Sequence, residues 1–160
     1  MSCESAMITE VITAKPDETV ETVLARLSKH SLRCVPVIDD EGVLVGLFCL
    51  NKVLENLLPV AVTMPDGLQR LNFVVGAAPG IAKRLNKLIS KNISEVMDED
   101  MYVVHPTTQS WEAIRLMVRY GSPIPVVEKD TGKLCGLISE QSSILELDQV
   151  IRQLEKDGEI

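Results

Sequence analysis

The sequence predicts an α/β protein of the α+β type, built from two copies of one unit in the order strand, helix, strand, strand, helix. Three observations support this prediction. The chain has 160 residues, 46% hydrophobic and 24% charged, which is an ordinary globular composition. The stretch that begins near residue 11 is similar to the stretch that begins near residue 101. In both stretches, apolar residues at helical spacing precede two short strand-like runs.

The two copies keep a nearly constant register. They correspond at offsets of 89 or 90 residues, in three pairs: Pro16 and Pro106, Pro36 and Pro125, and Gly46 and Gly136. The single-residue slips fall in loops, where they cost little. An offset this regular over the whole copy indicates an internal repeat rather than a chance likeness.

Each element of a copy has a local reason. An extended segment ends before Pro16 or Pro106, because proline disfavours helix in the residue before it. Asp17 and Thr107 are the expected helix caps. The remaining elements follow in order: a helix around 20–27 or 111–118, a strand over 35–38 or 124–127, a hairpin turn over 39–42 or 129–132, a strand over 43–49 or 134–139, and a helix over 51–58 or 141–156.

Composition excludes several partners. The formal net charge is −7, whereas a nucleic-acid-binding protein normally carries a basic field. No run of about 18 apolar residues is present, so no membrane span is predicted. The N-terminal sequence MSCESAMITE is polar and acidic rather than a signal peptide, so we expect the cytoplasm.

The four cysteines are Cys3, Cys34, Cys49 and Cys135, and none of them forms a C-x-x-C pair. Their spacing with His30 and His105 gives no zinc pattern. In a reducing compartment we expect Cys34 and Cys135 to be buried free thiols.

The repeated motif is X-Pro, an amphipathic helix, a Pro-Val strand, an acidic turn, and a glycine followed by two hydrophobic residues. This motif resembles the cystathionine-β-synthase (CBS) domain, and two tandem copies resemble a Bateman module. The resemblance covers about residues 5–58 and 93–155; Met7 and the segment 94–97 resemble the usual opening of each copy. It divides the chain into a first repeat (1–58), a basic insertion (59–92) and a second repeat (93–160) with a long final helix.

The resemblance implies that the repeats pack by three-stranded sheets around a pseudo-twofold axis, with two clefts between them. In many relatives one cleft holds AMP, ADP, ATP, S-adenosylmethionine or a related adenosine ligand. A Thr or Ser after the last strand contacts phosphate or ribose, and an Asp three residues later binds the ribose hydroxyls. A carboxylate suits this role, because it accepts from two hydroxyls at once.

The family's polar positions are only partly kept in this chain. In the first copy they hold Cys49 and Lys52, so both usual ligands are absent. In the second copy they hold Ser139, which fits, and Ser142, which offers one neutral hydrogen bond in place of a charged one. Loss of a charged hydrogen bond costs about 1.5–3 kcal/mol, roughly ten- to a hundredfold in affinity.

The second cleft is therefore the better candidate, although helix capping alone would also explain Ser139 and Ser142. Lys52 is either a phosphate contact or a solvated lysine. Arg33 either reaches a phosphate or pairs with the acidic turn. The remaining positions that the resemblance places at a ligand are Thr13, Lys15, Val35, Pro36, Val103, His105, Ile124 and Pro125.

The insertion is basic, with a glycine-rich run over 76–80 before Lys83 and Arg84. Such a turn at a helix start presents N–H groups to an anion, so Gly80, Lys83 and Arg84 are candidate anion contacts. The alternative is a basic helix face that pairs with an acidic lobe or a second subunit. The spacing does not match a P-loop, so ATP hydrolysis is not expected here.

The leading hypothesis is a free-standing regulatory module that binds an adenosine-type nucleotide and signals to an effector protein not identified by the sequence. No nucleophile, base and acid set suggests an enzyme. The alternative is a ligand-free structural or dimerisation module, and a third hypothesis is a redox sensor using Cys49. An apolar stripe on the last helix predicts either packing on its own repeat or a homodimer contact: Ile144, Leu147, Ile151 and Leu154.

Overall fold

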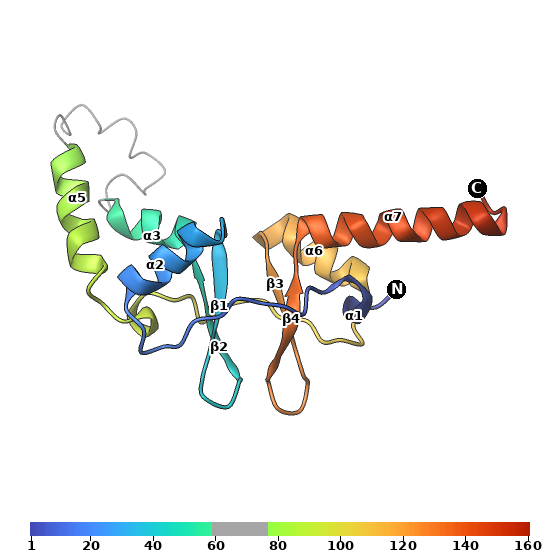
Figure 1. Cartoon of the computed structure of the whole chain (residues 1–160), viewed down its shortest axis with the longest axis horizontal. Helices are drawn as coiled ribbons and strands as arrows, with labels where there is room; N and C mark the ends of the chain where they lie inside the picture. Colours follow the sequence, from blue (N-terminus) through green and yellow to red (C-terminus); the bar gives the residue numbers. More distant parts are fainter. Residues whose placement is uncertain (59–76) are drawn as a thin grey trace. The chain divides into compact units, whose positions relative to one another are not determined.

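The computed structural model describes residues 1–58 and 77–160 (Figure 1). Its helices are α1 (Cys3–Ala6), α2 (Val20–Lys29), α3 (Leu50–Leu57), α5 (Ala77–Leu88), the short 3₁₀ helix η2 (Ile93–Glu95), α6 (Ser110–Tyr120) and α7 (Glu140–Asp157). Its strands are β1 (Cys34–Ile38), β2 (Leu44–Cys49), β3 (Ile124–Val127) and β4 (Leu134–Ile138). The predicted helix, strand, strand, helix order is confirmed in both copies.

The first strand of each predicted copy is reduced to a single parallel bridge, Ala14 to Val37 and Val104 to Val126. Strands β1 and β2 form one two-stranded sheet, and β3 and β4 form the other. Proline explains the short first strand. The next donor along the parallel ladder after the Val104 N–H would be residue 106, and Pro106 has none.

The predicted helix caps are wrong by two residues. Thr19 caps α2, where its side chain accepts from the Thr22 N–H, and Gln109 precedes α6 without a side-chain cap. Asp17 and Thr107 instead lie inside turns, in which the Glu18 N–H donates to the Lys15 carbonyl and the Thr108 N–H donates to the His105 carbonyl. The turn after each proline must be completed before the helix begins.

The chain forms two compact units, and each takes residues from both halves of the sequence. Unit 1 contains Met1–Thr13, Ile38–Leu44 and Asp100–Ile160, and unit 2 contains Ala14–Val37 and Val45–Glu99. The two opening segments are exchanged. Ile8 pairs with Leu137 of β4, and Asp98 pairs with Leu47 of β2. Each opening segment therefore adds to the sheet of the copy that it does not introduce.

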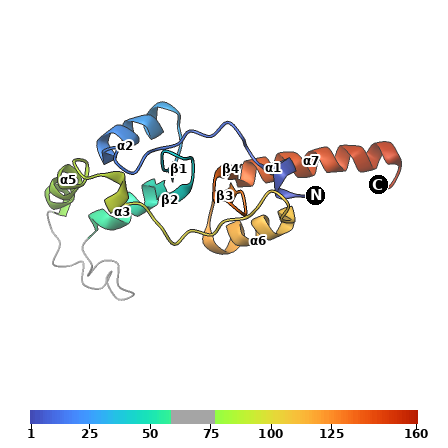
Figure 2. The ribbon, with the colours of Figure 1, turned by 90° about the horizontal axis from the view of Figure 1, so that it is seen from below.

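The core of unit 1 is aliphatic, as the composition predicts. In Figure 2, α1, α6 and α7 lie around the β3–β4 hairpin, and these helices contact one another. The strands are antiparallel, with Ile124 opposite Ile138. The buried cluster consists of Cys3, Val104, Ala113, Met117, Ile124, Val126 and Ile138.

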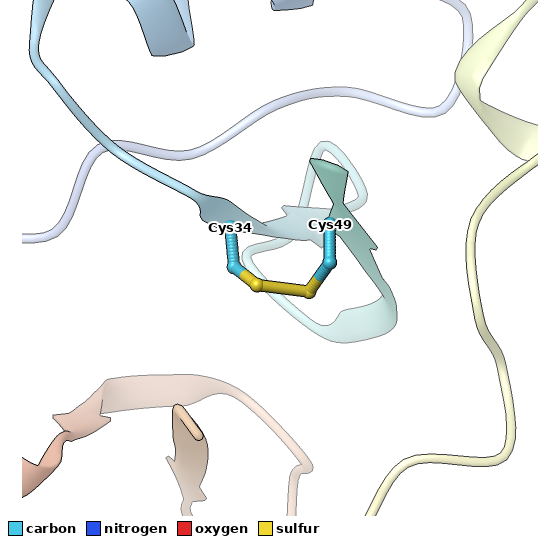
Figure 3. Close-up of a disulfide and its surroundings, with 2 residues drawn as sticks. All are labelled: Cys34 and Cys49. Atoms are coloured by element: carbon cyan, nitrogen blue, oxygen red, sulfur yellow. A yellow bond between two sulfur atoms is a disulfide. The ribbon is translucent and has the colours of Figure 1, made fainter. Parts of the chain in front are cut away.

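The cysteines correct the sequence-based expectation. Cys34 and Cys49 form a disulfide, with their Cα atoms 4.1 Å apart (Figure 3). Cys135 is a free thiol, but it is only partly buried; Cys3 is the fully buried free thiol. The hairpin explains the pairing, because the start of β1 and the end of β2 are neighbours across the sheet. Their separation of 15 residues in sequence does not reveal this.

None of the described helices is both long and apolar enough to cross a bilayer. In residues 1–58 and 77–160, no three His, Cys, Asp or Glu side chains are grouped to hold a metal ion.

Candidate ligand-binding site

In the second copy, the predicted positions gather where β4 ends and α7 begins. The Val104 N–H donates to the Pro125 carbonyl (3.0 Å), so Val103 lies near the start of β3. Ile124 faces Ile138 across the hairpin, and Ser139 is the next residue of the chain. Val103 is 38% exposed, whereas Ile124 and Pro125 are buried. The two buried residues therefore shape the site mainly through their backbone.

Ser139 and Ser142 form a reciprocal cap at the start of α7. The Ser142 N–H donates to Ser139 Oγ (3.2 Å), and the Ser139 N–H donates to Ser142 Oγ (3.0 Å). The Ser142 hydroxyl also donates to the Ser139 carbonyl (3.2 Å). Capping is thus one role of both serines, as the sequence allowed.

After the cap has formed, the hydroxyls of Ser139 and Ser142 still have hydrogen-bonding positions that a ligand can use. A hydroxyl has one donor and two acceptor positions. Ser139 uses one acceptor position in the cap, which leaves its O–H to donate. Ser142 uses its donor and one acceptor position, which leaves one lone pair. The pair therefore offers one donor, on Ser139 and suited to a phosphate oxygen, and two acceptor lone pairs, one on each hydroxyl, suited to a ribose hydroxyl.

His105 lies toward the other end of β3. Its Nδ1 is 2.9 Å from the Val127 carbonyl oxygen, so Nδ1 carries the hydrogen and donates. Its backbone N–H donates to Thr108 Oγ1 (3.1 Å). Nε2 is then the ring nitrogen that this bond leaves to other partners. The structure does not bring His105 to the serine cap, because the chain runs from Val103 to His105 away from that end.

In the first copy, Thr13 and Lys15 flank Ala14, whose N–H donates to the Pro36 carbonyl (3.0 Å). Val35 and Pro36 are fully buried, so they belong to the core of the protein. Arg33 precedes β1, and its carbonyl accepts from the Leu50 N–H at the start of α3 (2.9 Å).

The ion pair between Arg33 and the acidic turn, one of the two alternatives from the sequence, does not form. The alternative of a solvated Lys52 agrees with the structure. Arg33 is exposed and forms no ion pair with any described residue, because the acidic turn follows the opposite end of β1. Lys52 is partly exposed on α3 and pairs with Glu55 at 3.3 Å. A phosphate contact by either residue stays a prediction.

The structure also corrects the prediction of a glycine-rich turn before the helix of the insertion. Residues 59–76 lie outside the described part, but α5 begins at Ala77, so Gly80 lies within the helix rather than in a turn before it. Lys83 and Arg84 lie about two turns into α5, beyond its free N–H groups. Arg84 Nη1 donates to the Leu57 carbonyl (3.2 Å) at the end of α3. This contact satisfies a helix C-terminus, where a cation is favourable.

Unit 1 has a shallow groove, of which the sequence indicated only one side. It has a volume of about 250 Å³ and runs between α6 and α7. Its residues are Ile114, Met117, Val118, Glu140, Ser143, Ile144 and Leu147. Ser143 is 5% exposed, and its hydroxyl has no hydrogen-bond partner among the described residues. The stripe of the last helix indicated Ile144 and Leu147, but the α6 side depended on tertiary packing.

Glu18 ties the turn after Pro16 to α2. Its carboxylate accepts from the Lys15 N–H (2.8 Å) and forms a two-pronged ion pair with Arg26. The Arg26 hydrogen bond is the main cause that lowers the pKa of Glu18 below its usual value. A lowered pKa stabilises the fold above the ordinary carboxyl pKa, and this stability is lost as the pH falls through the folded-state pKa.

Glu18→Gln is therefore expected to cost about 1 kcal/mol at pH 7, since both side chains are less than a third exposed. The difference from the wild type should shrink below about pH 4.5, where the wild-type carboxyl begins to protonate in the unfolded chain. Urea unfolding between pH 3 and 7 measures it. Glu21→Gln, at an exposed position in the first turn of the same helix, is the control. A Glu18→Gln effect that is equal at pH 3 and pH 7 would refute the ion-pair explanation.

The two helix, strand, strand, helix copies match the fold of solved CBS-pair proteins. The family model described as "CBS domain" matches residues 3–59 and 93–142, which is more than half of the chain. The chain belongs to the CBS domain family.

Solved CBS-pair structures share the fold. CBSX2 from Arabidopsis thaliana is 25% identical with a TM-score of 0.70, and the match covers 94% of this chain and 96% of that one. A structure described as CBSX2 in complex with AMP matches at 24% identity and TM-score 0.68, covering 93% and 97%. The CBS pair of protein MJ0100, in complex with 5′-methylthioadenosine and S-adenosyl-L-methionine, matches at 19% and 0.64, also covering 93% and 97%.

The curated relatives are longer than the matching segment. Inosine-5′-monophosphate dehydrogenase of Aquifex aeolicus is 28% identical over 138 residues, which is 85% of this chain but 22% of the enzyme. The uncharacterised protein MJ1426 of Methanocaldococcus jannaschii is 36% identical over 52 residues, 32% of this chain and 31% of that protein. CBS pairs are generally regulatory rather than catalytic modules.

Proposed function

We propose that this chain is a regulatory CBS-pair module that binds an adenosine-type nucleotide, or a related small anionic ligand, at the serine cap of the second copy. The observation that carries the proposal is the Ser139–Ser142 cap, which offers one donor and two acceptor lone pairs where β4 meets α7. Two structural neighbours are described as complexes with AMP or with methylthioadenosine and S-adenosylmethionine. AMP, ADP, ATP and S-adenosylmethionine are therefore the candidate ligands.

The electrostatics favour one orientation of such a ligand. The N-terminus of α7 carries a partial positive charge and the Ser139 O–H donates beside it, so these two groups favour a phosphate there, against the charge of Glu140 in the first turn. Ser142 accepts from one ribose hydroxyl but lacks the charge of a carboxylate. We therefore expect weaker binding than a site with Asp at position 142 would show.

Thermal unfolding with each candidate ligand tests the proposal. A ligand present at about 100 times its Kd adds about 2.7 kcal/mol of stability, and we expect a rise in Tm of about 5–10 °C. Ser142→Asp should tighten binding roughly ten- to a hundredfold, because it restores a charged acceptor.

Ser139→Ala removes both the donor and the helix cap, so its ligand-induced shift is compared with its own ligand-free Tm. Ser143→Ala, one residue after Ser142, is the matched control and should keep the full shift. If no ligand moves the Tm of the wild type or of Ser142→Asp, the nucleotide-binding proposal fails.

A homodimer is the second part of the proposal, and one observation favours it. The outer face of α6 and α7, here called the α6–α7 face, exposes large apolar side chains. Its members are Trp111 (62% exposed), Val118 (84%), Ile144 (66%), Leu147 (37%) and Ile151 (47%). Helix α7 runs on past α6 and α1 (Figure 1), and Ile144 and Ile151 of its stripe stay largely exposed on unit 1. A second copy would cover these residues with an identical face.

If no nucleotide binds, the same face supports the alternative of a structural module that acts through protein contacts. In the regulatory version, the bound ligand changes the state of the module and an effector protein reads the change, in the cytoplasm. A ligand changes that state only by its difference in affinity for the two forms.

A further inference from the structure

The Cys34–Cys49 disulfide lies where the first copy departs most from the second. Cys49 ends β2 and occupies the cap position of α3, with no side-chain hydrogen bond. The corresponding residue of the second copy is Ser139, which caps α7 through its hydroxyl. Cys34 corresponds to Pro123 at the 89-residue offset. The second hairpin therefore forms without any cross-link at this place.

We propose that Cys34 and Cys49 form a reversible thiol–disulfide exchange site, which makes the stability of unit 2 respond to the redox state of its surroundings. The β3–β4 hairpin supports reversibility, because the same architecture stands without the bond. Strand pairing also places the start of β1 beside the end of β2, so the two cysteines are neighbours across the hairpin whether or not the bond is closed. Both residues are only half-buried, so a small thiol can reach them.

The other two cysteines are unsuited to exchange. Burial is the main cause that raises the pKa of the Cys3 thiol to about 11, and Glu112 adds to it. Burial also raises the pKa of Cys135. Exchange requires the thiolate, so Cys3 and Cys135 are poor nucleophiles near neutral pH. Neither of them is disulfide-bonded in the structure.

The chemistry is the exchange of two electrons with a thiol reductant, which supplies two thiols either from one dithiol or from two molecules of glutathione. A thiolate of the reductant attacks the Cys34 sulfur, the Cys34–Cys49 bond breaks, and Cys49 leaves as a thiolate. The start of α3 favours this leaving group, since it carries the helix dipole and Lys52 but no acidic residue in its first turn. The second thiol of the reductant then attacks the mixed disulfide and releases Cys34. Both cysteines take up a proton, and the reductant becomes a disulfide.

The bond restrains the unfolded chain between residues 34 and 49. Its loop of 15 residues is long enough that the oxidised protein should melt about 6–12 °C above the reduced one. Oxidation thereby holds the start of β1 to the end of β2 and the start of α3. This expectation does not depend on nucleotide binding.

The experiment equilibrates the folded protein with ratios of reduced to oxidised glutathione, quenches with acid and alkylates after unfolding. Two of the four cysteines should be labelled on the oxidised chain and all four on the reduced one, with the same curve from both directions. Cys135→Ser should leave this titration and the Tm difference unchanged. Cys34→Ser and Cys49→Ser should each melt like the reduced wild type, with no response to dithiothreitol.

Three results would overturn the proposal. The first is that the bond does not form in oxidised glutathione. The second is that the bond persists in excess dithiothreitol while the protein is folded. The third is that the Tm of Cys34→Ser falls on reduction as that of the wild type does. Circular dichroism of the reduced wild type at 25 °C tests the same point without a variant. A folded spectrum is expected, and loss of that spectrum on reduction would show that the bond is a permanent structural element.

Discussion

Gly136→Ala is expected to destabilise the protein by about 3 kcal/mol, which is near the upper end for overpacking a well-ordered site. A Cβ atom at this position would lie 2.5 Å from the Ile8 carbonyl oxygen and 3.2 Å from the Met7 side chain. The carbonyl belongs to backbone that is held in place, because the Ile8 N–H donates to the Leu137 carbonyl and the Leu137 N–H donates back. Relief therefore requires the opening segment to move off β4.

Urea unfolding and the Tm measure this effect, and we expect a fall of about 6–12 °C. The repeat provides a graded comparison. At Gly46 the nearest atoms to an added Cβ are the flexible end of the Met97 side chain, at 2.5 and 2.8 Å, so Gly46→Ala should cost less. At Gly80, in the exposed part of α5, nothing lies within 4 Å, and alanine should be neutral or stabilising. Equal losses at Gly136 and Gly80 would contradict the close-approach explanation.

Val118→Glu and Ile144→Glu are each expected to convert a homodimer into a monomer. Each substitution counts twice in a two-fold interface, and a carboxylate buried among apolar residues costs several kcal/mol. We expect dimer affinity to fall at least about a hundredfold, equivalent to about 2.7 kcal/mol or more. Sedimentation or light scattering should give twice the 17.6 kDa chain mass for the wild type and 17.6 kDa for each variant.

Ala82→Glu is the matched control, since it also places a glutamate at an exposed helix position, on α5, which is not part of the α6–α7 face. It should leave the dimer intact. A monomeric wild type, or a dimer that survives both glutamates, would show that this face does not join two copies. The unfolding free energy of each variant separates loss of association from loss of folding.

Much of the fold could be predicted from local pattern. The residues of α2, α6 and α7 carry apolar side chains at helical spacing, and the Pro-Val strands are short, apolar and bounded by turn residues. These are properties of neighbouring residues, so the sequence displays them directly. Each predicted element also occurs in both copies of the repeat, which supports the prediction.

The candidate site was predictable only by position. The resemblance identified Ser139 and Ser142, but their reciprocal bonds depend on the actual cap geometry of α7. Gly80 was misplaced because the helix start lies three residues earlier than the glycine suggested. One of the two alternatives for Arg33 was an ion pair with the acidic turn, which the length of β1 prevents, since five residues of strand span about 15 Å.

Local periodicity and composition were sufficient to predict the order of elements, the aliphatic core and membership of a repeated α+β class. Tertiary structure alone decided three features: the exchange of the opening segments, the Cys34–Cys49 pair and the exposed α6–α7 face. Each of these features depends on residues that are distant in sequence and become neighbours only when strands pair and helices pack. The two close glycines show the same dependence, since only the folded chain brings the Ile8 carbonyl to Gly136.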